Sequence, residues 1–370
     1  MQMQKKIFIT DEMKLEGSAL AQFHDSATKS GMVRAVAFPD LHPGKGHPVG
    51  AAFLTANIIY PYIIGNDIGC GMSFFQSELK QHKFVADKIA RTLDDLESPY
   101  EDAAVHASHH GISDLKFPRS VGTIGGGNHF AEFLRVEEIF DEEKFCGPGL
   151  SKKQVYLLVH SGSRGLGNSI LEEYIKNMNS AGIDPQSDTG TKYLHEHNYA
   201  VTWAKFNRKM IAERIGEKLR SQFKLIFDLV HNSIEELELE GKTHYLHRKG
   251  ASAFNRYAII PGSRGDFTYL VYVPDSNLDH LFSLPHGAGR KWQRGMVKGR
   301  ISHLYSQSDL LKTELGSVVI CEDKELLFEE APEAYKKVSF VISELEKLNL
   351  AKVVAKFRPL LTYKRRDHSK

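Results

Sequence analysis

Hydrophobic residues along this chain form short runs of two kinds. Runs rich in β-branched and aromatic residues predict strands at 6–10 (KIFIT), 32–38 (MVRAVAF), 154–160 (QVYLLVH), 267–273 (FTYLVYV) and 317–321 (SVVIC). Apolar positions that recur at helical spacing predict helices at 84–96, 168–179, 195–240 and 332–348. Because strands and helices do not alternate regularly along the chain, we expect an α+β fold.

The 370 residues are expected to form one large domain, 1–370, with a short basic tail at 365–370. Apolar residues make up 41% of the chain, which is enough for a large core, and no Pro/Ser-rich linker interrupts it. The longest apolar stretch, 51–65, is too short and too often interrupted to span a membrane. The first residues lack the apolar run of a secretory signal, so we expect a cytoplasmic protein with no membrane partner.

Charge and cysteine usage refine this picture. The net charge is +2, so overall electrostatics do not indicate a nucleic-acid binder, but two local basic segments, 289–300 and 363–370, are candidates for contact with phosphates. The three cysteines, Cys70, Cys146 and Cys321, cannot all pair, which favours a reducing compartment. Cys70 is then free to act as a thiolate ligand.

Five potential metal ligands lie in short segments, most of them rich in glycine. They are Asp67 and Cys70 in GNDIGCGM, His129 in GGGNHF, His160 in HSGSRG and His231 in LVHN. Asp67 and Cys70 are three residues apart, so a tight turn lets both reach one metal ion. Thiolate and imidazole ligands suit zinc, iron or cobalt, and a carboxylate keeps manganese open, so the residues alone do not select the metal.

The glycine-rich loop before His129 lets backbone amides approach a phosphate without a clash from Cβ. The chain contains no G-x-x-x-x-G-K-[ST] motif, which argues against a Walker-type NTPase, and GTIGGG is only a degenerate dinucleotide fingerprint. His286 in PHGAGR is a candidate nucleophile. Together with the five ligand candidates, it points to two-metal nucleotidyl chemistry.

Taken together, the motifs resemble those of the RtcB-type RNA ligases. The similar segments follow the family's order over residues 39–364 and are PDLHPGKGHPVG, GNDIGCGM, GTIGGGNHFAEF, HSGSRGLGN, NYAVTWAKFNR, LVHN, HRKGA, IPGSRG, PHGAGR, EAPEAYK and RPLLTYK. The resemblance implies mixed β-sheets that form a central core flanked by helices. It also implies a GTP- and manganese-dependent enzyme that joins RNA 3′-phosphate or 2′,3′-cyclic phosphate ends to 5′-hydroxyl ends. A histidine–GMP adduct and an RNA–ppG end would be its intermediates.

The resemblance also implies two sets of metal ligands. Asp67, Cys70 and His129 would bind one manganese ion, and Cys70, His160 and His231 would bind a second, with the thiolate as the bridge. Zinc, cobalt and iron remain alternatives to manganese.

Other residues take roles through the same resemblance. His286 would be the guanylylated nucleophile, and Arg164 and Arg290 would contact phosphate or RNA. The residues that would bind GTP or GMP are Asn128, Glu132, Ser263, Gly287, Ala288, Gly289, Tyr335 and Lys364. A carboxylate at Glu132 accepts from the N1–H and N2–H₂ edge of guanine, which adenine lacks.

The chain departs from the better-known members of the family in two places. The segment between Cys70 and His129 is shorter, and six residues follow Lys364. The reduced length and the HGAGRKWQR segment resemble a short bacterial subgroup that is coupled to a release-factor-H homologue, which implies RNA repair rather than tRNA splicing. That homologue or an archease-type activator is the expected protein partner.

Two other classes of function use some of the same residues. A dinuclear metal-dependent phosphoesterase acting on RNA or nucleotides needs the five ligands but no nucleophilic histidine. A non-catalytic RNA-binding protein needs neither the ligands nor the nucleophile.

Overall fold

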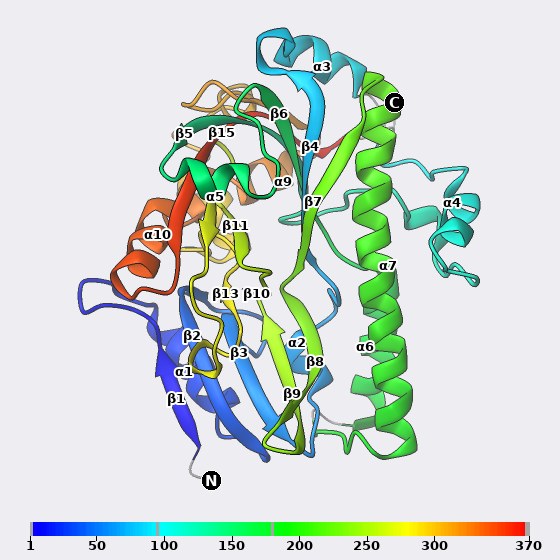
Figure 1. The fold of residues 1–370 in the computed structure, drawn as a ribbon, viewed down its shortest axis with the longest axis vertical. Helices are drawn as coiled ribbons and strands as arrows, with labels where there is room; N and C mark the ends of the chain where they lie inside the picture. Colours follow the sequence, from blue (N-terminus) through cyan, green and yellow to red (C-terminus); the bar gives the residue numbers. More distant parts are fainter. Residues whose placement is uncertain (1–2, 94–95, 179–180, 367–370) are drawn as a thin grey trace.

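The computed structural model describes residues 3–93, 96–178 and 181–366, and most of their strands belong to two sheets (Figure 1). The five-stranded sheet has the order β1-β2-β3-β9-β8, with β1 parallel to β2 and the other pairs antiparallel. Its strands are β1 (Gln4–Ile7), β2 (Met32–His42), β3 (Val49–Ala56), β8 (Asn232–Leu239) and β9 (Lys242–Lys249).

The eight-stranded sheet has the order β11-β12-β15-β5-β6-β4-β7, and β14 also pairs with β15, in parallel. Its strands are β4 (Gly71–Lys80), β5 (Phe130–Ile139), β6 (Gln154–Ser161), β7 (Phe223–Val230), β11 (Tyr257–Pro261), β12 (Thr268–Tyr272), β14 (Val318–Cys321) and β15 (Lys352–Arg365). A small pair joins β10 (Ala251–Ser252) to β13 (Leu284–Pro285).

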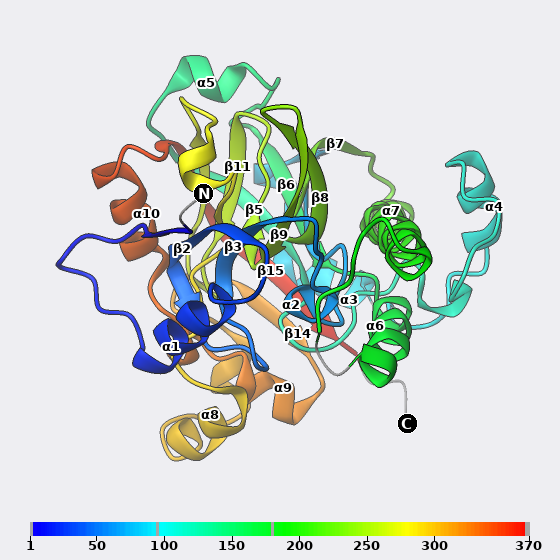
Figure 2. The ribbon, with the colours of Figure 1, turned by 90° about the horizontal axis from the view of Figure 1, so that it is seen from below.

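Helices flank these sheets (Figure 2). They are α1 (Gly17–Ser26), α2 (Pro61–Ile64), α3 (Ala86–Thr92), α4 (Ala103–His109), α5 (Glu142–Cys146), α6 (Gly165–Met178), α7 (Asp188–Leu219), α8 (Arg294–Ile301), α9 (Lys324–Glu329) and α10 (Val338–Lys347). Short 3-10 turns lie at Gln81–Lys83, Pro118–Ser120, Leu278–His280, Asp309–Leu311 and Pro332–Ala334. Within the described ranges, none of these helices has both the length and the apolar character needed to cross a bilayer.

A common hydrophobic core lies between the two sheets. Phe38 and Leu54 enter it from the five-stranded sheet, and Phe74 and Leu158 enter it from the eight-stranded sheet. Because neighbouring residues of a strand point to opposite faces, Phe75 packs on the other side of the large sheet, in a cluster that includes residues of α7. The expected α+β fold, with sheets at the centre and helices around them, is confirmed.

The longest helix corrects one prediction. The sequence predicts a helix over 195–240, but α7 ends at Leu219 and Arg220 follows with a left-handed φ of 50°. β7 and β8 occupy most of the remaining stretch, because the apolar residues of FKLIFDLV fit a strand as well as a helix. Phe227 and Leu229, two residues apart, both enter the core. The chain here passes from the eight-stranded sheet to the five-stranded one.

The other predicted elements are found with changed ends. The strands at 32–38, 154–160, 267–273 and 317–321 correspond to β2, β6, β12 and β14, whereas β1 ends at Ile7, so 8–10 are not part of the strand predicted at 6–10.

The helices predicted at 84–96 and 168–179 correspond to α3 and α6. The helix predicted at 332–348 is a 3-10 turn followed by α10, because Tyr335 between them has an extended backbone. Residues 94–95, 179 and 367–370 of the predicted helices and tail lie outside the described residues.

Candidate metal and nucleotide site

One cavity of about 1290 Å³ is lined by every residue that the sequence singled out as a site candidate. Its wall includes the five ligand candidates, His286, the eight nucleotide candidates and both arginines. The segments that meet there run from Glu16, which directly precedes α1, to the C-terminal strand β15. Folding therefore gathers motifs that are dispersed over most of the chain.

Four of the ligand candidates come from the ends of four neighbouring strands. His129 directly precedes β5, His160 lies near the end of β6, Cys70 directly precedes β4, and His231 directly follows β7. These strands are adjacent in the order β5-β6-β4-β7, and neighbouring strands in a sheet lie ~4.8 Å apart. The sheet therefore sets the spacing of these side chains.

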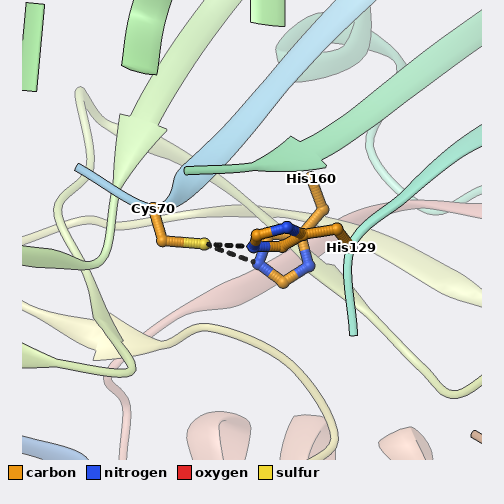
Figure 3. A group of neighbouring side chains, drawn as sticks. All are labelled: Cys70, His129 and His160. Atoms are coloured by element: carbon orange, nitrogen blue, oxygen red, sulfur yellow. Dashed lines mark hydrogen bonds between the residues drawn. The ribbon is translucent and has the colours of Figure 1, made fainter. Parts of the chain in front are cut away.

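The donor atoms of the ligand candidates face one another. The Cys70 Sγ atom lies 3.4 Å from His129 Nε2 and 3.2 Å from His160 Nε2 (Figure 3). Asp67 and His231 flank this group, with Asp67 Oδ2 2.9 Å from His129 Nε2 and His231 Nε2 3.3 Å from His160 Nε2. Burial alone would raise the pKa of Asp67, but the neighbouring His129 holds it well below its usual range.

The protonation states of these groups suit metal binding. Burial lowers the pKa values of His160 and His231 well below the ordinary histidine value, so both rings are neutral. His160 Nδ1 lies 3.2 Å from the Asn128 carbonyl oxygen, to which it donates, and this leaves the Nε2 lone pair facing Cys70. Burial also raises the pKa of the Cys70 thiol, and a bound cation would displace that proton. One sulfur, three imidazole nitrogens and one carboxylate fit borderline divalent cations.

The His286 side chain is oriented by the buried carboxylate of Asp40, which lies in the five-stranded sheet. His286 directly follows β13, and its Nδ1 atom lies 2.7 Å from Oδ2 of Asp40 in β2. The backbone N–H of His286 donates to the same oxygen at 3.2 Å. With Nδ1–H donated to Asp40, the lone pair on Nε2 remains available. The His286 ring centroid is 4.8 Å from that of His231, so the candidate nucleophile and the metal ligands share one wall.

The approach of the His286 loop to Asp40 requires a glycine. Gly289 has a φ of +73°, and a Cβ on it would lie 2.2 Å from the Asp40 carbonyl oxygen. A side chain at Gly289 would therefore push the loop away from β2. This contact gives a structural reason for the glycine in PHGAGR.

The nucleotide candidates form a second polar group. Glu132 is buried and accepts a hydrogen bond from the Thr362 hydroxyl at 2.6 Å, and burial raises its pKa to about 7. The Tyr335 hydroxyl donates to Glu330 at 2.5 Å, and Lys364 Nζ lies 3.7 Å from Glu330. Glu132 can therefore offer a carboxylate to the donor edge of a base, whereas Glu330 is engaged by Tyr335 and Lys364.

The two arginine candidates have different surroundings. Arg290 donates to Glu330 at 3.0 Å and to the Tyr335 hydroxyl at 2.9 Å, and its other nitrogens bond to backbone carbonyls. These bonds position Tyr335, and contact between Arg290 and phosphate or RNA stays a prediction. Arg164 has a left-handed φ of 56°, and its guanidinium lies against Gly125, where a Cβ would be 1.6 Å from Nη1. The glycine-rich loop thus makes room for Arg164 in the cavity wall.

Sequence reasoning missed three residues of the site, Asp40, Glu330 and Thr362. Asp40 lies in the PDLHPGKGHPVG segment, where an acid among prolines, glycines and histidines was an available signal. Glu330 stands two residues before the proline of EAPEAYK, and Coulomb attraction to Lys364 and two arginines lowers its pKa to about 2 although burial opposes this.

Comparison with known proteins gives a consistent result. The family model described as "tRNA-splicing ligase RtcB" matches residues 22–116 and 106–365. The chain is 43% identical over 357 residues to the "RNA-splicing ligase RtcB2" of Escherichia coli, which covers 96% of this chain and 94% of the relative.

More distant relatives come from archaea. The chain is 29% identical over 418 aligned residues to the "tRNA-splicing ligase RtcB" of Methanococcus maripaludis, with 88% of this chain and 87% of the relative covered. The Thermococcus kodakarensis protein of the same name is 28% identical, with 88% and 86% covered. The first of these alignments is longer than the 370-residue chain, so that archaeal relative carries segments that this chain lacks.

Proposed function

Because the chain belongs to the RtcB family, we propose that it is a GTP- and manganese-dependent ligase that joins RNA 3′-phosphate or 2′,3′-cyclic phosphate ends to 5′-hydroxyl ends. The observation that carries the proposal is the pairing of His286 with Asp40 next to the metal-ligand cluster. A phosphoesterase that activates water on metals has no need for an oriented histidine there.

The first step is guanylylation of His286. Its Nε2 lone pair attacks the α-phosphorus of GTP, an N–P bond forms, and the bond to the leaving pyrophosphate breaks. Asp40 holds the proton on Nδ1 and stabilises the positive charge that develops on the ring, as a buried carboxylate does for a catalytic histidine. Glu132 and Tyr335 select guanine. The Lys364 Nζ atom donates to the Gly127 carbonyl oxygen at 2.9 Å, so the guanine pocket is in direct contact with the glycine-rich loop.

Two manganese ions would be held by Asp67, Cys70, His129, His160 and His231, with Cys70 shared. Such ions, when bound, neutralise charge on the phosphoryl oxygens. The Arg164 guanidinium and the amides of the Gly125–Gly127 loop would supply further positive potential from the protein itself.

The later steps transfer GMP to RNA and then expel it. Water first attacks the phosphorus of a cyclic phosphate, and the bond to the 2′-oxygen breaks, which leaves a 3′-phosphate and a 2′-hydroxyl. An oxygen of the RNA 3′-phosphate attacks the phosphorus of the adduct, the N–P bond breaks, and an RNA–ppG end results. The 5′-hydroxyl of the second RNA then attacks the 3′-phosphorus, a phosphodiester forms, and GMP leaves with the electron pair. Neutral Nε2 of His286 is restored after the second step.

A labelling experiment tests the proposal. The protein is incubated with α-labelled GTP and Mn²⁺, and a covalent, acid-labile adduct is expected, because phosphoramidates hydrolyse in acid. His286→Ala should give no adduct. His280→Ala is the matched control, because that histidine is also buried but does not line the cavity. A wild type without adduct, or a His286→Ala variant that labels fully, would refute the ligase proposal.

The cellular role follows from the same family membership. The similarity in length to the Escherichia coli relative supports the proposal that this chain belongs to the short bacterial subgroup and that it acts in RNA repair. A release-factor-H homologue or an archease-type activator stays the predicted partner.

A further inference from the structure

A half-buried tryptophan lies at the edge of the cavity, in a segment that the chemistry above does not use. Trp292 lines the cavity and packs against the cluster that contains Val297 and Ile301 of α8. Its backbone N–H donates to the Ala334 carbonyl at 3.2 Å, and its own carbonyl accepts from Arg290 Nε at 3.1 Å. The ring is therefore held in place while part of it stays exposed. A fixed aromatic ring of this kind offers a surface to another flat ring.

Positive charges surround this ring. Lys291 Nζ lies 4.5 Å and the Arg300 guanidinium 4.9 Å from the ring centroid of Trp292. Both cations are exposed, and no carboxylate forms an ion pair with either of them in the described part of the chain. Lys298 on the same helix differs, because it is paired with Glu325.

A third cation connects the ring to the metal-ligand loop. Arg294 begins α8, its side chain is 44% exposed, and its Nη2 atom lies 3.4 Å from Asn128 Oδ1. Its Nε atom lies 3.9 Å from Glu330 Oε1, the one carboxylate among the described residues with which it pairs. Asn128 directly precedes the ligand candidate His129. The positive charges thus extend from the outer side of α8 to the place where the phosphoryl groups would react.

We propose that Lys291, Trp292, Arg294 and Arg300, here called the basic platform, bind the single-stranded end of an RNA. One base stacks on Trp292, and the cations move from the ring and its surroundings to the flanking phosphates. This inference rests on the proposed function, which supplies RNA as the substrate. The combination of a π-face with exposed cations fits alternating bases and phosphates, whereas an acidic peptide would engage the cations alone.

Tryptophan fluorescence gives a direct binding test. The chain has two tryptophans, and Trp203 is fully buried, so quenching by an added oligonucleotide reports on Trp292. We expect a short single-stranded RNA with a 3′-phosphate to quench the emission of the wild type. Fluorescence anisotropy of an end-labelled strand, which needs no tryptophan, should show that the wild type binds it about 5- to 150-fold more tightly than Trp292→Ala, the range that one stacked base represents. Trp292→Phe should recover most of the affinity. Phe340→Ala, which removes an exposed aromatic ring of α10 outside the cavity, should bind like the wild type.

Abasic probes make the test specific for stacking. A series of oligonucleotides, each with one base removed, is titrated against the wild type and Trp292→Ala, first with 3′-phosphate strands and then with 5′-hydroxyl strands. Removal of the stacked base should weaken binding to the wild type but not to the variant, and its position identifies the strand that the platform holds. Equal losses for both proteins at every position would overturn the proposal. So would blunt duplex RNA that binds as tightly as the single strand.

The experiment separates this inference from the ligase proposal. Binding and quenching need no GTP, and adduct formation from labelled GTP needs no RNA. A protein that binds RNA through Trp292 but forms no GMP adduct would support RNA binding by the basic platform and refute the ligase proposal. A Trp292→Ala variant that loses adduct formation in parallel with RNA affinity would assign Trp292 to the nucleotide site and overturn the platform.

Discussion

The metal-ligand cluster and the candidate nucleophile share a cavity, but the fold builds them differently. Cys70, His129, His160 and His231 come from the ends of four hydrogen-bonded strands of one sheet. His286 lies outside that sheet, after a strand of two residues, and its orientation depends on a carboxylate 246 residues away in sequence. The candidate ligands are therefore spaced by backbone pairing, whereas the candidate nucleophile is oriented by one side chain. This difference predicts which substitutions remove a whole function and which only slow a step.

The largest effect is expected at the residue shared by both metal sets. Cys70→Ala should abolish GMP labelling and bound manganese, because it removes the sulfur that faces both His129 and His160 and that we propose both ions share. The measurement is metal content per chain together with adduct yield. Cys321→Ala is the control, since Cys321 is also buried but does not line the cavity. Normal labelling in Cys70→Ala would contradict the bridging thiolate.

A smaller effect is expected at the carboxylate that orients the nucleophile. Asp40→Asn keeps the shape of the side chain but lets an amide N–H face His286, which favours the tautomer with the proton on Nε2. The rate of adduct formation should fall roughly 100- to 1000-fold, while the KM for GTP stays close to that of the wild type. Rapid-quench kinetics at several GTP concentrations separates the two parameters.

Two results would speak against that role of Asp40. An unchanged rate would show that the carboxylate does not orient His286. A rise in KM with an unchanged rate constant would assign Asp40 to nucleotide binding instead. Bound metal should stay normal in this variant, since the strand ends that hold the ligands are intact.

The regularity of the apolar pattern decides which strands of the fold could be predicted from the sequence. The runs at 32–38 and 154–160 are rich in apolar and β-branched residues, so the sequence predicts β2 and β6 directly, although β2 continues to His42. The strand β15 was not predicted, because Lys356, Arg358 and Pro359 interrupt its apolar pattern. The pairing of β15 with β5 shifts register between Pro359 and Leu361, which is how the sheet accommodates a residue without an N–H.

The site was predictable in so far as its residues stand in recognisable motifs. Five ligand candidates and His286 could be named from short segments, and the cavity contains them all. Asp40 and Glu330 stand in two of the motifs but were not singled out there, because their importance comes from partners that only the fold brings near. Arg290 shows the opposite case. Its motif predicts contact with phosphate or RNA, and the structure shows in addition that its guanidinium donates hydrogen bonds to Glu330 and Tyr335.

The smallest expected effect concerns guanine recognition and depends on pH. Burial raises the pKa of Glu132 to about 7, so the carboxyl is mostly protonated at pH 6 and mostly ionised at pH 8. Only the ionised form accepts from both N1–H and N2–H₂ of guanine. GTP affinity should therefore be present above pH 7 and decline as the pH falls, with KM rising by about tenfold per pH unit below 7.

The Glu132→Gln variant isolates this titration from others in the cavity. Its amide keeps an oxygen for the Thr362 hydroxyl, so the pocket should retain its shape, but the side chain no longer ionises. KM for GTP should be high at all pH values and nearly flat between pH 6 and 8, while histidine titrations affect both proteins alike. If Glu132→Gln instead shows the same slope as the wild type, the pH dependence arises elsewhere, and Glu132 does not read the guanine edge as a carboxylate.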